Sequence, residues 1–565
     1  PYAGNPHVRF DEGEVAPAAT PRRGSLLYNK LVPMVFVLIA GALAAGAATT
    51  VRMLPGEKWW GLSAAQGTSM PWDERTKASV DLRKSGGYNV FSSLLVSDKG
   101  RYVWCANTAL FDFANGVITV TPDAGAPVEV AAPGTNLREA FRAVAAKRFP
   151  ASGRAPDPLF FSAPQYCTWI ELTYHQNERD ILAYAKSMVD NGLPPGVFMI
   201  DDTWQAGYGD WRFEPTRFPD PKGLVRKLHD MGFKVILWMC PWVSMDTPAF
   251  RRVAYGVNPD DVKGYPAKGG FLMDGDRPAA DRWWNGFSAL LDFTHPNARA
   301  WFDEQLDRLV RGYGVDGFKF DGGELESYVR GYRAHDGKAR PAEVAAAYAE
   351  YATKFPVCEF RNGWKLHGRP VVERLLDKDH SWKALGLLIP DLIAGGLLGN
   401  SFMCPDMIGG GQWETFLPGS PFDPELFIRS VQVHLLCGMM QFSASPWRVL
   451  DAEGQRIVRD LVRMRQERFA GFFVKLAEEC GRTGEPMIRN LEYVFPGRGY
   501  ADVRDEFLMG DSLLVAPQLT KGAAERTVVL PPGRWRSDEG VDYDGPGTII
   551  VRTPLARLPH FQLQD

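Results

Sequence analysis

Residues 315–324 read Val-Asp-Gly-Phe-Lys-Phe-Asp-Gly-Gly-Glu, and this stretch decides the fold. Its centre, Gly317–Phe320, has the length and the aromatic content of a buried strand, and Asp321 follows it directly. The residues before it, Pro296–Arg311, carry apolar side chains at helical spacing and a proline in the first turn. A helix that leads into a buried strand is the repeating unit of parallel α/β sheets.

The same helix-then-strand order recurs on both sides of this stretch. Helical periodicity over residues 181–189 precedes one apolar run, and the helical pattern Lys222–Met231 precedes another. Eight such units predict a (β/α)8 TIM barrel, which we place at residues 157–462. A doubly wound sheet is the alternative, but no glycine-rich phosphate loop follows the first strand. The eight predicted strands lie near Tyr166–Trp169, Val197–Ile200, Val235–Trp238, Gly317–Phe320, Val357–Phe360, Val371–Leu376, Ser401–Cys404 and Met439–Phe442.

Both flanks of the predicted barrel are rich in β-forming residues. Residues 55–156 contain short runs such as Val117–Val120 between turn residues, which indicates a small N-terminal β-sandwich. Residues 463–565 are predicted to form a C-terminal β-domain with strands at Phe507–Met509, Leu513–Val515 and Thr527–Leu530, the last stopped by Pro531-Pro532-Gly533.

The N-terminal region contains a candidate membrane segment. Residues 1–30 are polar and contain several Pro and Gly, so we expect them to be disordered. The run Leu31–Ala48 holds 18 residues without a charge, continues to Val51 and follows several basic residues. This pattern predicts a transmembrane anchor over residues 31–51, with the catalytic part outside the cytoplasm, in a periplasm, the extracellular space or a secretory lumen. A cleaved signal segment is the alternative, because small residues crowd the end of the run.

Composition excludes several classes of function. The net charge is only −3 and basic residues are scattered, so we expect no nucleic-acid partner. The nine His form no cluster and the seven Cys have no CxxC spacing, so we expect neither a metal nor a cofactor. Most of the Cys are expected to be small buried hydrophobes, although disulfides are left open. Nothing in the pattern indicates the oligomeric state.

Carboxylates follow four of the predicted strands at their C-terminal ends. They are Asp201-Asp202 after the second, Asp321 after the fourth, Asp377 after the sixth and Asp406 after the seventh. Barrel enzymes place their chemistry at these ends. Paired carboxylates are what glycoside hydrolysis needs, whereas no Ser-His-Asp order or phosphate loop is present. The sequence therefore predicts a glycoside hydrolase acting on a sugar substrate.

Two segments resemble the catalytic motifs of glycoside hydrolase family 31. Residues 315–324 resemble the nucleophile motif, Lys-x-Asp-x-Gly-Glu, which implies that Asp321 is the nucleophile. Residues 376–382, Leu-Asp-Lys-Asp-His-Ser-Trp, resemble the acid/base segment. Counting back from Trp382 assigns that role to Asp377, with Asp379 as the runner-up.

The resemblance covers about residues 157–540. Arg361 matches the substrate-binding arginine of the family, and residues 507–517 resemble its C-terminal β-domain. Within the family, residues 200–205, 213–221 and 405–410 are most similar to an α-galactosidase-like group of membrane proteins. The resemblance implies a retaining α-glycosidase without a cofactor, whose partner is an α-linked oligosaccharide or glycoside.

Further residues are expected to bind the sugar. Asp201, Asp202 and Asp406 are candidate acceptors for sugar hydroxyls, with a structural role in loops as the alternative for the last two. Trp169, Trp204 and Trp238 are candidate platforms for the sugar face, with core packing as an equal alternative. Lys319 and Arg361 are expected to keep Asp321 ionised through opposite charge.

Two departures from the family pattern leave the sugar open. Leu376 stands where the family usually has Gly, and the His of many α-glucosidases is not evident late in the barrel. The expected activity is that of an α-galactosidase, with an α-glucosidase or α-xylosidase as the alternative. A membrane-anchored glycan-binding protein without catalysis is the alternative from another class.

Overall fold

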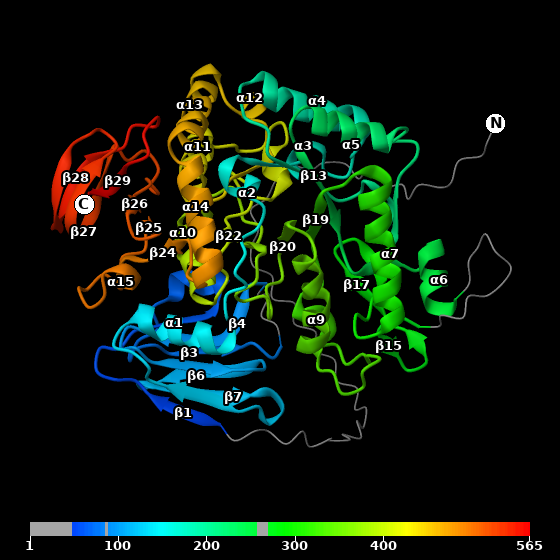
Figure 1. Cartoon of the computed structure of the whole chain (residues 1–565), viewed down its shortest axis with the longest axis horizontal. Coiled ribbons are helices and arrows are strands. Elements are labelled where there is room, and N and C mark those ends of the chain that lie inside the picture. The colour runs from blue at the N-terminus through cyan, green and yellow to red at the C-terminus, as the bar shows by residue number, and fades with distance from the viewer. Residues whose placement is uncertain (1–47, 85–88, 257–268, 565) are drawn as a thin grey trace, which may run out of the picture. The chain divides into compact units, whose positions relative to one another are not determined.

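The structure is a computed structural model that describes residues 48–84, 89–256 and 269–564 (Figure 1). At its centre, eight parallel strands are hydrogen-bonded in chain order. A bridge between Met407, which follows β22, and Gln441 of β23 closes the sheet into a barrel. Each predicted strand overlaps an observed one, which confirms the (β/α)8 class. The strands are β9 (Gln165–Cys167), β10 (Val197–Ile200), β13 (Lys234–Met239), β19 (Gly317–Phe320), β20 (Val357–Phe360), β21 (Val372–Arg374), β22 (Met403–Cys404) and β23 (Gln441–Phe442).

Helices cover the outside of the barrel (Figure 1). The three helices predicted from periodicity are confirmed, each within two or three residues of the expected ends. Local signals fix their starts: the Asp220 side chain accepts a hydrogen bond from the Gly223 N–H at 2.9 Å, and Pro221 opens the same helix. The helices are α4 (Glu178–Asp190), α5 (Pro221–Asp230), α7 (Pro296–Tyr313), α9 (Pro341–Ala349), α10 (Trp382–Leu397) and α11 (Pro424–Leu435).

One crossover departs from the alternating order. Residues 361–371, all of which the structure describes, join β20 to β21 without a helix. The N-terminal region contacts this crossover instead, because Phe91 stacks on Trp364 at 4.9 Å and the Gly363 N–H donates to the Asn89 carbonyl at 3.1 Å. The apolar surface that a helix would cover is therefore shielded by another part of the chain.

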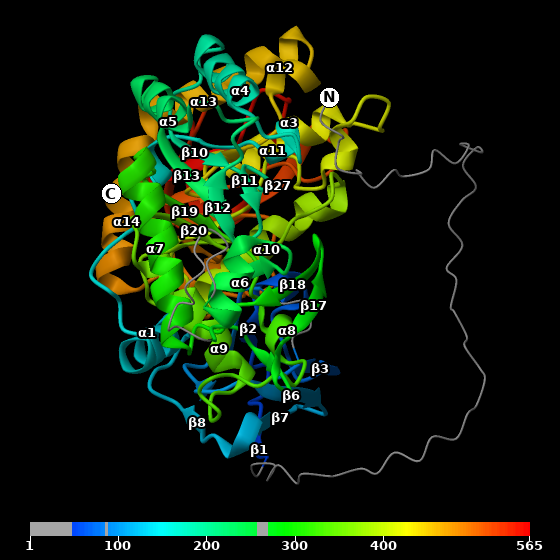
Figure 2. The ribbon, with the colours of Figure 1, turned by 90° about the vertical axis from the view of Figure 1, so that its right-hand side faces the viewer.

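The N-terminal region forms two four-stranded antiparallel sheets, one of β1, β7, β6 and β3, the other of β2, β4, β5 and β8. Figures 1 and 2 both show the first of them at the foot of the view. The predicted anchor ends too late, because Thr49–Arg52 is strand β1 and pairs with β7 (Val117–Pro122). The rest of that segment lies outside the described residues. No helix within the described ranges has the length and apolarity needed to cross a bilayer. The other strands are β2 (Trp59–Ser63), β3 (Ala78–Asp81), β4 (Phe91–Ser97), β5 (Tyr102–Cys105), β6 (Ala109–Ala114) and β8 (Val128–Ala131).

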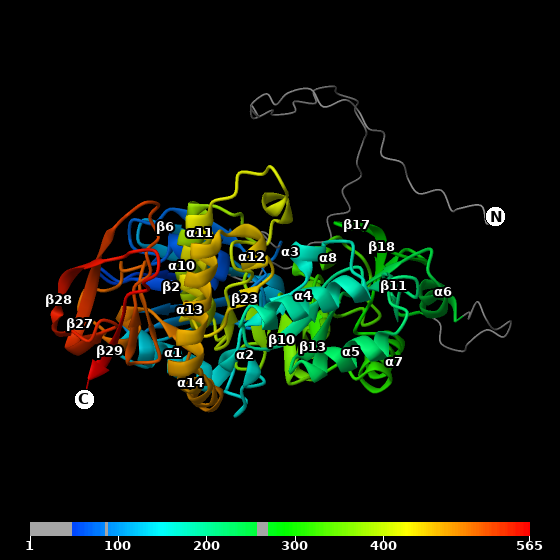
Figure 3. The same ribbon diagram turned by 90° about the horizontal axis from the view of Figure 1, so that it is seen from above.

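The C-terminal region is a six-stranded sheet, separated from the barrel strands by α13 (Ala452–Arg468) and α14 (Ala470–Thr483) (Figure 3). The predicted strands at Phe507 and Leu513 are confirmed as β25 (Phe507–Met509) and β26 (Leu513–Val515). The predicted stop at Pro531 is wrong, because β27 (Glu525–Ser537) continues through it with a register shift between Leu530 and Gly533. A bulge accommodates prolines, which have no N–H to donate to a ladder.

All seven cysteines are buried free thiols, so the described chain contains no disulfide. This confirms the prediction that they act as small hydrophobic residues. One of them, Cys167, also contacts the site described next.

Candidate active site

A cavity of about 310 Å³ opens at the C-terminal ends of the barrel strands. Eight of the ten predicted site residues line it: Asp321, Asp377, Asp201, Asp202, Lys319, Arg361, Trp169 and Trp238. The parallel strands bring these distant residues to one end of the barrel. The volume is at the lower end of the range for small-molecule sites.

Asp321 is held by donors on both carboxylate oxygens. Its Oδ1 accepts the Gly322 N–H and lies 2.9 Å from Arg361 Nε, while its Oδ2 accepts the Trp238 indole N–H at 2.9 Å. Burial opposes ionisation, but the positive charges of Arg361, Arg374 and Lys319 outweigh it and lower the pKa of Asp321. The carboxylate is therefore ionised and fixed in orientation, as a nucleophile must be.

Asp377 lies across the same guanidinium from Asp321. Arg361 Nη1 is 4.0 Å from Asp377 Oδ2, and Arg374 Nη1 donates to Asp377 Oδ1 at 2.5 Å. Burial raises the pKa of Asp377, but the charges of Arg374 and Arg361 prevail and hold it well below the ordinary value. In the sugar-free site Asp377 is therefore ionised, whereas an acid catalyst must be protonated. The sequence did not indicate that the charges around Asp377 oppose its predicted role as an acid.

Asp406 shares Arg374 with Asp377. Arg374 Nη1 lies 2.7 Å from Asp406 Oδ1, and the other oxygen of Asp406 is buried without a hydrogen-bond partner among the described residues. Burial raises the pKa of Asp406, helped by the negative charge of Asp377. Asp406 has a φ of 78°, so its backbone is held in the left-handed region. Of this pair, Asp377 carries the charge and Asp406 is the easier to protonate.

Lys319 pairs with Asp201 rather than with the nucleophile. Its Nζ lies 2.7 Å from Asp201 Oδ2, which also accepts the Cys167 thiol at 3.0 Å. Both charged groups are buried, so they stabilise each other where water cannot. Lys319 is predicted to keep Asp321 ionised. Its positive charge does lower the pKa of Asp321, but from a longer distance than that of its ion pair with Asp201.

Asp202 is surrounded by donors. Its carboxylate accepts hydrogen bonds from Gln205, Tyr208 and Asn285 side chains at 3.2, 3.0 and 2.8 Å, and from the Thr203 N–H at 2.6 Å. Burial raises the pKa of Asp202 to about 6 despite these bonds. The two oxygens line the cavity with an orientation set by neighbours, which suits an acceptor for a sugar hydroxyl.

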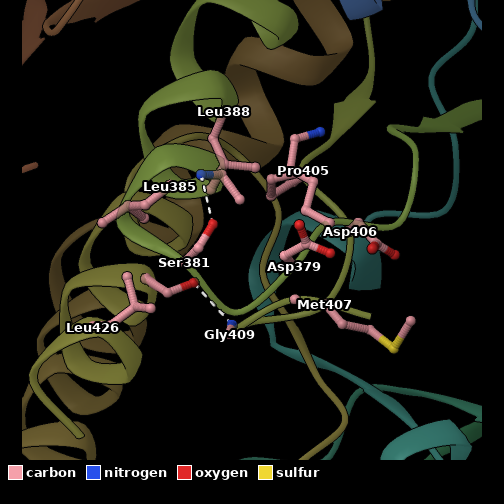
Figure 4. Close-up of a pocket in the computed structure, with 13 residues that line it drawn as sticks. Asp379, Ser381, Leu385, Leu388, Pro405, Asp406, Met407, Gly409 and Leu426 are labelled. Carbon is pink, nitrogen blue, oxygen red and sulfur yellow. Dashed lines mark hydrogen bonds between the residues drawn. The ribbon is translucent and has the colours of Figure 1, made fainter. Parts of the chain in front are cut away.

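Two predicted site residues do not reach the cavity. Trp204 is fully buried and donates its indole N–H to the Trp238 carbonyl at 2.9 Å, so it supports Trp238 from behind. Asp406 lines a separate cavity of about 20 Å³, together with Asp379 and Ser381 (Figure 4). That volume holds about one water molecule and excludes a sugar. Asp379 does not line the larger cavity, so the geometry favours Asp377 over the runner-up.

The sequence reading missed several residues that line the larger cavity. Arg374 ends strand β21, and a basic residue within an apolar strand was an available signal. Trp284 is 51% exposed at the turn between β17 (Ala280–Trp283) and β18 (Gly286–Leu290), and its ring lies over Arg361 at 5.3 Å. The others missed are Tyr174, Met407, Gly411, Gln412 and Trp413, which only the fold brings here.

Comparison with known proteins identifies the family. The model of the "Glycosyl hydrolases family 31 TIM-barrel domain" matches residues 158–467, and that of the family's C-terminal domain matches residues 484–564. A mouse protein named myogenesis-regulating glycosidase is 33% identical over 431 residues, which are 75% of this chain and 59% of that protein. An α-xylosidase from Emericella nidulans is 27% identical over 69% of this chain and 51% of its own length. The chain thus spans only half to three fifths of these curated relatives.

A solved structure shows the same fold. The dextranase of Flavobacterium johnsoniae in complex with glucose superposes with a TM-score of 0.76 at 20% identity, covering 91% of this chain and 66% of that one. The barrel model alone accounts for more than half of the chain, and its residues include every group that lines the candidate site. The chain therefore belongs to glycosyl hydrolase family 31, whose TIM-barrel and C-terminal domains it contains.

Proposed function

We propose that the chain is a retaining α-glycoside hydrolase with α-galactosidase-like specificity, in which Asp321 is the nucleophile and Asp377 the acid/base. The observation that carries the proposal is that one guanidinium, that of Arg361, contacts both carboxylates at the edge of one sugar-sized cavity. A retaining mechanism needs two carboxyl groups roughly 5–5.5 Å apart on either side of the scissile bond.

In the first step, a carboxylate oxygen of Asp321 bonds to the anomeric carbon as the bond to the leaving oxygen breaks. Asp377 gives its proton to that oxygen, and a glycosyl-enzyme ester forms. In the second step, Asp377 takes a proton from water, whose oxygen displaces Asp321 from the anomeric carbon. The configuration is retained because two inversions occur.

The acid step requires Asp377 to gain a proton after the sugar binds. Its side chain is 35% exposed in the free site, so a sugar in the cavity removes water from it. Desolvation raises the pKa of a carboxyl group. We infer that substrate binding, rather than the free enzyme, supplies the protonated acid.

The sugar preference rests on the segments that resemble the α-galactosidase-like group; the mouse relative is named only as a glycosidase and supports the reaction class. An α-glucosidase or α-xylosidase of the same family is the second candidate, favoured by the relative named an α-xylosidase. A glycan-binding protein without catalysis remains the alternative of another class, and the paired carboxylates count against it.

Side-by-side turnover of aryl α-galactoside, α-glucoside and α-xyloside tests the proposal. We expect the galactoside to react fastest and proton NMR to show the α-anomer as the first product. A fluorinated α-galactoside should add its glycosyl mass to the protein and not to an Asp321→Asn variant. Absence of both turnover and trapping with all three sugars would refute the proposed hydrolase.

We also infer that the chain is exported, with the uncharged run of residues 31–48 as an anchor or signal segment. The support is the uncharged run from Leu31 and the basic residues before it. The test is alkaline extraction of membranes from expressing cells, together with protease protection. Loss of the full-length chain into the alkaline supernatant would contradict an anchor, and protection identical to a cytoplasmic marker would contradict export.

A further inference from the structure

A second cavity, which the candidate active site does not use, lies between the N-terminal strands and the barrel. Its volume is about 390 Å³, larger than that of the active-site cavity. Its walls come from β4, β5, the end of α1 (Leu137–Arg148) and the crossover after β20. The size is sufficient for one or two sugar rings.

Aromatic rings form much of the wall. Trp104, Phe149 and Trp364 line the cavity. Trp364 is held in place because Phe91 stacks against it at 4.9 Å. Trp104 is similarly fixed by the Arg148 guanidinium, which lies 4.3 Å from its ring centroid. Rings that are already oriented can pack against the flat apolar face of a ligand at low entropic cost.

The charges around this cavity are of one sign. Arg148, Lys365 and Arg369 line it, and none of the carboxylates in the described part of the chain does. Glu129 neutralises Arg148, but neither Lys365 nor Arg369 forms an ion pair with any described residue. Lys365 has a φ of 63°, a conformation that a residue with a side chain seldom adopts without a reason. The cavity therefore has two cations without an ion pair among the described residues, and one of them, Lys365, has its Nζ 5.9 Å from the centroid of the Trp364 ring.

Two buried nitrogen atoms in the wall lack partners. The Trp364 indole nitrogen and His367 Nδ1 are buried without a hydrogen-bond partner, and Trp364 is only 2% exposed. The Trp364 indole nitrogen can only donate a hydrogen bond, whereas a neutral imidazole nitrogen donates or accepts according to its tautomer. Burial also lowers the pKa of His367 to about 4, so that imidazole is neutral and adds no charge.

We propose that this cavity binds a sugar residue that carries an acidic group, with its ring against Trp104 and its anion facing Lys365 and Arg369. The choice of a sugar, and only that choice, rests on the proposed function. The site is distinct from the catalytic one, although the crossover that begins at Arg361 contributes to both.

Calorimetric titration of the full chain with β-linked disaccharides tests the proposal, since an α-glycosidase does not consume them. Cellobiouronic acid and cellobiose differ only in one carboxylate, and a 6-sulfated cellobiose separates a sulfate from a carboxylate ligand. We expect one or both acidic sugars to bind at least about tenfold more tightly than cellobiose, with weaker binding at higher salt.

The Lys365→Gln, Arg369→Gln double variant should weaken that binding about tenfold and leave hydrolysis of the aryl α-glycoside unchanged. Lys475→Gln, an exposed charge removed elsewhere, is the matched control and should change neither. Thermal melting confirms that both variants fold. Equal affinity for cellobiose, or full affinity in the double variant, would overturn the proposal.

Two further probes separate other ligands. Inorganic sulfate binding as tightly as the acidic sugars would reduce the site to a simple anion site, and adenosine monophosphate binding more tightly would make it a nucleotide site; either result overturns the proposal. Binding of an acidic sugar by a chain that hydrolyses no glycoside would refute the proposed function and leave this inference standing.

Discussion

Replacing Arg361 with Gln should move the acidic limb of the pH–rate profile to higher pH. Arg361 contacts Asp321 at 2.9 Å, and its charge is one of those that hold the pKa of Asp321 below the ordinary value against burial. Without the charge, the pKa of Asp321 rises. Because only the ionised carboxylate attacks the sugar, the reaction then requires a higher pH.

The structure sets the size of the effect. Two unit charges about 4 Å apart attract by about 4 kcal/mol at an effective dielectric constant of about 20. Arg361 is shared with Glu324 at 2.5 Å, and Arg374 and Lys319 remain in the variant, so only part of this energy is lost at Asp321. We expect kcat/KM at the acidic end of the profile to fall by roughly ten- to a hundredfold more than at neutral pH.

The assay is kcat/KM of an aryl α-glycoside over the accessible pH range. Arg361→Lys keeps the charge and should restore most of the acidic limb, although it loses the planar geometry. Glu324→Gln removes the competing carboxylate and leaves the cation, so its acidic limb should not move to higher pH. If Arg361→Gln lowers activity equally at every pH, the cation positions the substrate and does not control the ionisation of Asp321.

Three further predictions follow from single side chains. Asp377→Asn should lower turnover by about 10²- to 10⁴-fold for an alkyl glycoside and by much less for an aryl glycoside with a good leaving group; equal losses would contradict the acid role. Trp284→Ala should raise KM several-fold with little change in kcat, because the exposed ring lines the cavity without touching either carboxylate oxygen that reacts. An unchanged KM for several aglycones would show that the ring does not contact substrate. Glu485 is buried, which opposes ionisation, yet hydrogen bonds from arginines lower its pKa from 4.5 to about 2. Ionised Glu485 therefore stabilises the folded state fully above about pH 4.5, and this stabilisation is lost as the pH falls toward 2. Glu485→Gln should lower the free energy of unfolding, measured by urea denaturation, by about 3 kcal/mol at pH 7 and by progressively less in acid. A loss that does not depend on pH would contradict the ion-pair account.

Much of the fold was predictable because its signals are local. The strand Gly317–Phe320 and the helix before it are encoded in the spacing of apolar side chains within a few residues. The order of units then restricts the topology to a parallel sheet, and the acids that end its strands must meet at one face. The lining of the cavity by Asp321, Asp377 and Asp202 follows from that order.

The exceptions are residues whose roles depend on partners far along the chain. Trp204 and Trp238 have the same residue type, but Trp204 follows β10 and is packed in the core, whereas Trp238 lies within β13 and reaches the cavity. The prolines after Leu530 predict the end of a strand. In the structure, β27 continues through them with a bulge, because it pairs with a long neighbouring strand.

The barrel, the acids at its strand ends and the family motifs can be predicted from the amino-acid sequence, because they depend on periodicity and order within short stretches. Only the tertiary structure decided which charges surround each acid: Lys319 on Asp201, Arg361 between Asp321 and Asp377, and Arg374 shared by Asp377 and Asp406. Electrostatic interactions depend on separation in space and on burial, and neither quantity can be read from spacing along the chain.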